Sequence, residues 1–77
     1  MPTIKRFGSI KIKIYGGDHN PPHVHVIDPA FAAQVAIADG EILNGTLAAT
    51  NRTTILRWIA NNRGALMETW NHLASQD

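Results

Sequence analysis

The segment Asp18-His19-Asn20-Pro21-Pro22-His23-Val24-His25-Val26 holds three of the four histidines and two of the four prolines of the chain. The two prolines favour extended backbone and remove two amide donors, so the run that follows them is predicted to begin a β-strand. Alternation along this strand places His23 and His25 on one face and Val24 and Val26 on the other. Residues two positions apart on a strand are about 6.6 Å apart at the backbone, so the two imidazoles can converge on one ion or one phosphate.

The segment before this motif alternates aliphatic and cationic residues. Ile10, Ile12 and Ile14 are interleaved with Lys11 and Lys13, which is the period-two pattern of a half-buried strand. A glycine-rich turn then leads toward the histidine motif. If the two strands pair antiparallel, their isoleucines and valines face the core together, and both lysines share the outer face with the two histidines.

The chain after the histidine strand predicts two more strands. Residues 31–38 alternate again, with small side chains on the outer face. Asp39-Gly40 predicts a type I′ hairpin turn, which needs positive φ at both central residues. Glu41-Ile42-Leu43 is then a short fourth strand, and Asn44-Gly45 is expected to end the sheet.

The last third of the chain has helical spacing. Thr50 or Asn51 is expected to cap a helix that begins just after it. Asn61, Asn62 and Gly64 are poor helix formers, so we expect a kink or two short helices there. Apolar residues recur at three- and four-residue steps and form one stripe: Ile55, Ile59, Leu66, Trp70 and Leu73.

These patterns predict one α+β domain over residues 1–77. Its architecture is a four-stranded antiparallel β-meander followed by one kinked or two short C-terminal helices packed on one face. A single core is expected from Ile10, Ile12, Ile14, Val24, Val26, Val35, Ile37, Ile55, Ile59, Leu66 and Trp70.

Composition limits the function classes. The hydrophobic content of 44% and the charged content of 17% are those of a globular protein. The chain has no cysteine, which removes disulfides, thiolate zinc sites and thiol nucleophiles and fits the cytoplasm. No apolar stretch approaches the roughly 20 residues that span a bilayer, so we expect no membrane association. With a net charge of only +1, any attraction for nucleic acid must come from local clustering of cations.

The chain resembles a family of small prokaryotic proteins known as domain of unknown function 4160. The resemblance rests on four stretches of sequence: Met1-Pro2-Thr3-Ile4, the histidine motif 18–26, Asp39-Gly-Glu-Ile-Leu-Asn-Gly-Thr-Leu47 and the Trp58/Leu66/Trp70 pattern. Members of this family are often encoded beside another small domain of unknown function. The resemblance therefore implies a component of a two-gene, toxin–antitoxin-like module with an operon-encoded small protein partner, and it implies no catalytic residue.

The residues themselves support a first hypothesis, which is a Lys/His sheet face that binds or acts on RNA or DNA. Arg6, Lys11 and Lys13 are the candidate phosphate-binding residues. His19, His23 and His25 are the candidate catalytic residues. Metal-independent RNA cleavage needs one histidine to take the 2′-hydroxyl proton and another to protonate the leaving 5′-oxygen, while a lysine stabilises the phosphate and no cofactor is required.

Two alternatives stay open at this point. His23 and His25, with Asp18 or His19 as a third ligand, provide the donor set of a site for zinc or another divalent metal. A non-enzymatic interaction module that binds the partner protein through the sheet face or a sheet edge is the other alternative. The sequence leaves the oligomeric state open.

Overall fold

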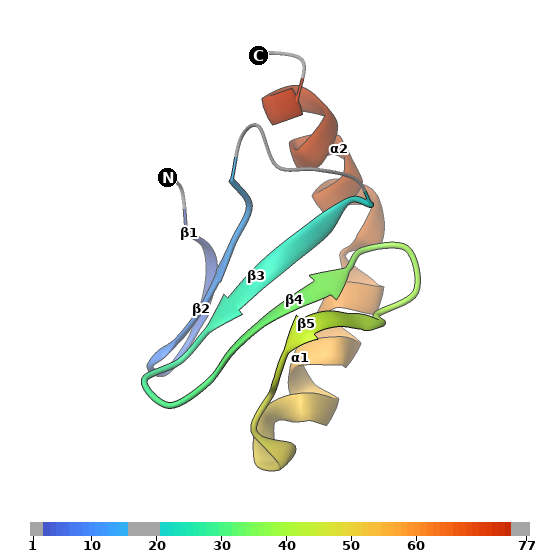
Figure 1. Cartoon of the computed structure of the whole chain (residues 1–77). Helices are drawn as coiled ribbons and strands as arrows, with labels where there is room; N and C mark the ends of the chain where they lie inside the picture. The colour runs from blue at the N-terminus through green and yellow to red at the C-terminus, as the bar shows by residue number, and fades with distance from the viewer. Residues whose placement is uncertain (1–2, 16–20, 75–77) are drawn as a thin grey trace.

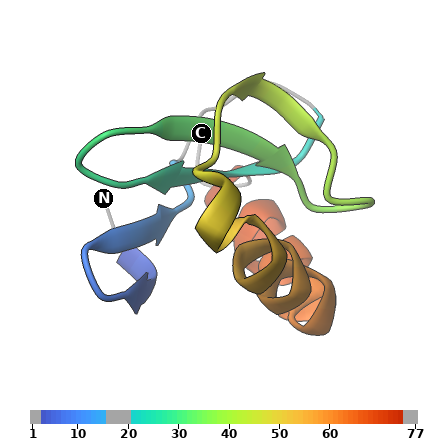
Figure 2. The ribbon, with the colours of Figure 1, turned by 90° about the horizontal axis from the view of Figure 1, so that it is seen from below.

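The computed structural model describes residues 3–15 and 21–74 and has an α+β fold. The strands are β1 (Thr3–Phe7), β2 (Ile10–Lys13), β3 (His23–Ile27), β4 (Ala32–Ala36) and β5 (Ile42–Gly45), and the helices are α1 (Ala49–Asn61) and α2 (Arg63–Ala74). The strands form one antiparallel sheet in the order β1-β2-β3-β4-β5, so the meander is confirmed (Figure 1). Both helices lie on the same side of this sheet (Figure 2). Within the described residues, no helix therefore lies over the opposite face, called here the open face.

The sheet has five strands, so the prediction of four was wrong. The additional strand is β1, which turns into β2 through Gly8 at a φ of 60°. It pairs with β2 so that Arg6 lies opposite Lys11 and Phe7 lies opposite Ile10. The register shifts between Thr3 and Lys5. This irregularity interrupts the period-two pattern that reveals a strand in the sequence.

The connection from β4 to β5 differs from the predicted turn. Gly40 has a φ of 76°, but no non-glycine residue that the structure describes has positive φ, so Asp39-Gly40 does not form a type I′ turn. Instead, the Asp39 carboxylate accepts a hydrogen bond from the Glu41 N–H at 2.9 Å, and the Gly40 N–H donates to the Ala36 carbonyl at 2.9 Å. β5 spans Ile42–Gly45, so the last strand of the sheet ends at Asn44-Gly45 as predicted, but both residues belong to the strand, which was predicted over 41–43.

The C-terminal region consists of two helices that break at Asn62, which confirms that part of the prediction. The Asn62 side-chain amide donates a hydrogen bond to the Trp58 backbone carbonyl at 2.8 Å. The backbone carbonyl of Asn62 accepts a hydrogen bond from the Leu66 N–H at 2.9 Å. The predicted cap was wrong, because α1 starts after Ala48 and has no side-chain cap. Arg63 joins the start of α2 to the sheet by donating from Nε to the Ile37 carbonyl at 2.6 Å.

The core lies between the helices and one face of the sheet. All eleven predicted core residues are buried, joined by Ala33 and Leu47, and none is more than 7% exposed. The edge of the core toward β1 is closed by Phe7, whose ring packs edge-on against Trp58 at 6.0 Å. Neither helix has the length and apolar character required to cross a membrane, as judged on residues 3–15 and 21–74.

Candidate functional site

Antiparallel register places a row of polar side chains across the open face of the sheet. Lys13 on β2 lies opposite His25 on β3, His25 lies opposite Gln34 on β4, and Gln34 lies opposite Asn44 on β5. Directly opposed residues project from the same face, so these four side chains form one row, called here the polar row. Strands are about 4.8 Å apart, so the row extends over about 14 Å.

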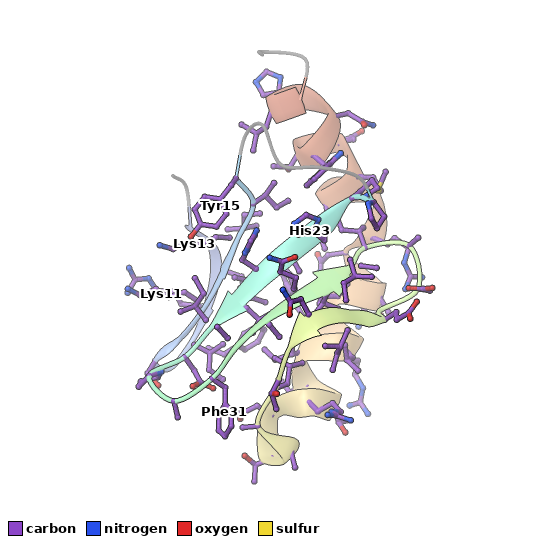
Figure 3. All side chains as sticks on the ribbon, in the orientation of Figure 1. Lys11, Lys13, Tyr15, His23 and Phe31 are labelled. Carbon is purple, nitrogen blue, oxygen red and sulfur yellow. The ribbon has the colours of Figure 1, made fainter. Side chains whose placement is uncertain are left out.

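A second row runs beside the polar row and places two fixed cations together. Arg6 on β1 lies opposite Lys11 on β2, and Lys11 lies opposite Ile27 on β3. Lys11 and Lys13 are two positions apart on β2 and therefore share the open face. Figure 3 shows both lysines on the side of the sheet formed by β2. This end of the open face carries Arg6, Lys11 and Lys13, called here the cation cluster.

The other end of the polar row is hollowed into a pocket of about 230 Å³. Its lining includes three members of the polar row and three apolar or small residues: His25, Gln34, Asn44, Ile27, Ala32 and Gly45. A side chain at Gly45 would collide with the Ala32 carbonyl oxygen and would lie 2.9 Å from the Ala33 Cα. The close approach of β4 and β5 at this point thus depends on glycine.

His25 joins the cation cluster to the pocket. It lies opposite Lys13 and lines the pocket beside Gln34. The Tyr15 ring contacts it edge-on, with ring centroids 4.5 Å apart and an interplanar angle of 86°. This edge-to-face contact is a favourable aromatic geometry and restricts the orientation of the imidazole. His25 is only half-buried, so its ring is accessible from the open face.

His23 lies in a different environment from His25. We predicted both imidazoles on one accessible face, but His23 is only 6% exposed. Its Nδ1 is 2.8 Å from the Pro21 carbonyl, and its ring packs against Trp70 at 5.2 Å and against His25 at 5.1 Å. The ladder partner of His23, Ala36, is also buried, so the open face is inaccessible at this corner of the sheet. The labelled His23 in Figure 3 lies where β3 begins, close to α2.

Two of the predicted site residues, Asp18 and His19, lie outside the described residues. Within residues 3–15 and 21–74, no three side chains of the histidine, cysteine or carboxylate type come together as a metal site. The metal hypothesis with His23, His25 and Asp18 therefore stays a prediction. The same holds for the catalytic roles of the three histidines.

Sequence reasoning missed the two carboxamides of the site. Gln34 was only part of an alternating pattern, and Asn44 was expected only to end the sheet. The register places both side chains next to His25 and makes them part of the pocket. The signal in the sequence is the outward position of Gln34, since a polar residue among alanines faces solvent. Nothing in the sequence aligned Asn44 with it.

Comparison with known proteins gives the chain a family but no activity. The family model described as Domain of unknown function (DUF4160) matches residues 9–71, from just before β2 to within α2. No curated protein and no solved structure matches the chain significantly. The matched region includes Lys11, Lys13, the histidine strand, the pocket residues and every buried residue of the core. The chain therefore belongs to the DUF4160 family of domains of unknown function.

Proposed function

We propose that this protein binds the phosphate backbone of RNA or single-stranded DNA through the open face of its sheet. The observation that carries the proposal is the pairing of Arg6 directly opposite Lys11, with Lys13 opposite His25 one rung away. Like charges directly opposite each other on a sheet destabilise it. A bound polyanion removes this repulsion, so the arrangement is useful where phosphates are the ligand.

The distribution of charge supports the same proposal. The net charge of the chain is only +1, so there is no strong overall field to attract nucleic acid. The cation cluster nevertheless gathers three of the seven lysines and arginines on one face. The lysines are half-buried, which is consistent with aliphatic stems along the sheet and ammonium groups directed to solvent. The affinity then depends on a local patch and is sensitive to salt.

The burial of His23 favours binding over cleavage. Acid–base cleavage of RNA by two histidines requires both imidazoles to reach the reacting oxygen atoms. His23 is packed beneath the surface against Trp70 and is engaged at Nδ1 with Pro21, whereas His25 faces the open side of the sheet. A binding role for His25 therefore requires less rearrangement than a catalytic role for the pair.

The family resemblance supports placing this activity in a two-gene, toxin–antitoxin-like module in the cytoplasm. The partner would be the product of the neighbouring gene, which is expected to be a small protein. The open sheet face and the sheet edges leave distinct surfaces for two ligands, because nucleic acid would occupy the open face while a protein can pair with an edge strand, β1 or β5. Copurification of the two tagged gene products tests this part of the proposal.

Fluorescence anisotropy with short labelled RNA and DNA single strands tests the binding proposal. We expect binding at low salt that weakens with a slope of log affinity against log salt of about −2, since each neutralised phosphate on a single strand contributes about −0.7. The double variant Lys11→Gln/Lys13→Gln is expected to lose most of this affinity.

The matched control is Arg52→Gln/Arg57→Gln, which removes the same charge from exposed positions on α1. The control should bind nearly as well as the wild type. Equal losses in the two double variants would show that only net charge matters and would contradict the proposed interface. The absence of any binding at low salt would overturn the proposal and favour the protein-interaction module.

A further inference from the structure

We infer that the pocket at the end of the polar row is a receptor for one unstacked nucleobase of a single-stranded nucleic acid. This inference rests on the proposed function, because the cation cluster would hold the backbone while the pocket takes a base. The pocket adjoins the cation cluster through the Lys13–His25 pair. The proposed site for the nucleic-acid backbone and the proposed site for the base therefore adjoin each other on the same face of the sheet.

The size of the pocket fits a single small ring system. Its volume of about 230 Å³ lies below the roughly 300–1,000 Å³ of pockets that enclose drug-sized ligands. Three of its lining residues, Ala32, Ala33 and Gly45, have little or no side chain and take up little of the space. A planar heterocycle can enter this space, while a complete nucleotide would have its sugar and phosphate outside. The phosphate then lies toward Lys13.

The lining offers hydrogen-bonding groups and a ring of the kind that recognise a base. Gln34 and Asn44 lie directly opposite each other, and each carboxamide offers one acceptor oxygen and two N–H donors. Carboxamides of this kind form paired hydrogen bonds with the edges of bases, adenine above all. His25 supplies a ring against which a base can stack, and the Tyr15 contact restricts the orientation of that ring. Ile27 adds an apolar wall.

The register places both carboxamides on the open face of the sheet. Gln34 is half-buried and Asn44 is exposed, so both amide groups are accessible to a ligand. They are held by adjacent strands whose separation is fixed by the contact of Gly45 with Ala32. Two amides on paired strands, beside a ring and a cation, form a binding arrangement for a base on a phosphate backbone.

The test compares oligonucleotides that carry bases with matched abasic ones. Wild-type protein should bind a single strand at least roughly tenfold more tightly than the same strand with abasic sites, because each stacked base contributes substantially to affinity. The double variant Gln34→Ala/Asn44→Ala should lose this preference and keep both its affinity for the abasic strand and its salt dependence. Ala32→Val, which fills the pocket without changing charge, should have the same effect. Asn71→Ala, an exposed carboxamide on α2, is the control and should behave as the wild type.

Failure of this inference is distinguishable from failure of the proposed function. If normal and abasic strands bind equally, and only the lysine substitutions weaken binding, the base pocket is wrong and the phosphate interface stands. If no oligonucleotide binds, NMR titration with the four free ribonucleosides examines the pocket alone. Shifts of the Gln34 and Asn44 side-chain amides that disappear in Ala32→Val would support the pocket, and their absence would overturn it.

Discussion

His23 packs its ring against Trp70, with ring centroids 5.2 Å apart, and this contact joins the start of β3 to α2. The same imidazole is 5.1 Å from His25, which faces the pocket on the open side. The two histidines of one motif therefore contribute differently, since His23 belongs to the packing between helix and sheet and His25 belongs to the accessible surface.

This difference predicts losses of stability of different size for the two alanine substitutions. His23→Ala should lower the free energy of unfolding by about 2 kcal/mol, because it opens a cavity against Trp70 and removes the contact with the Pro21 carbonyl. His25→Ala should cost less than about 1 kcal/mol because the ring is half-buried. Urea unfolding followed by circular dichroism measures both. An equal or larger loss for His25→Ala would contradict the assignment.

The core predicts a severe effect for Trp70→Ala. Trp70 is 5% exposed and packs in the single core with Leu66 and Ile59. Removal of a buried tryptophan side chain costs about 3–5 kcal/mol, which is most of the stability of a domain this small. Thermal unfolding should show a large drop in Tm or no cooperative transition. Trp58→Leu, at a half-buried position, is the milder comparison.

Two glycines predict opposite signs for the same substitution. Gly45 has a φ of 79°, and an added Cβ would collide with the Ala32 carbonyl oxygen, so Gly45→Ala should destabilise the protein by more than about 1 kcal/mol. Gly64 lies in α2 with nothing within 4 Å of an added Cβ, so Gly64→Ala should stabilise it by about 0.4–1 kcal/mol. Chemical denaturation measures the pair. A stable Gly45→Ala protein would show that β4 and β5 can separate without cost.

Replacement of His25 should weaken nucleic-acid binding, because its ring lies opposite Lys13 and lines the pocket. His25→Gln should lower the affinity for single strands, whereas His72→Gln, at an exposed position on α2, should leave it unchanged. Anisotropy titrations at constant salt and constant pH provide the measurement. Equal affinities for the wild type and His25→Gln would show that the imidazole does not contact the ligand.

Much of the fold could be predicted from local patterns. The alternation of Ile10, Ile12 and Ile14 with the two lysines placed that strand, and the weak helix formers near Asn62 placed the break between the helices. β1 escaped prediction because its register shift disrupts the alternation, and the Asp39-Gly40 turn was misassigned because only the glycine adopts positive φ.

The candidate site was predictable only in its cationic half. The shared face of Lys11, Lys13 and His25 follows from the two-residue period of strands, which can be recognised in the sequence alone. The carboxamide half depends on Gln34 lying opposite Asn44, and that alignment depends on an irregular register between β4 and β5. Pairing across strands is a long-range property, so no local pattern contains it.

The sequence by itself determined which residues face the core, because hydrophobic periodicity acts through neighbouring positions of the chain. Only the tertiary structure decided which outward residues are buried and which are accessible. His23 and His25 are equivalent by alternation, yet the closeness of α2 and Trp70 buries the first and leaves the second accessible. The burial of an outward residue depends on which distant elements pack against it. The alternation along its own strand contains no information about those elements.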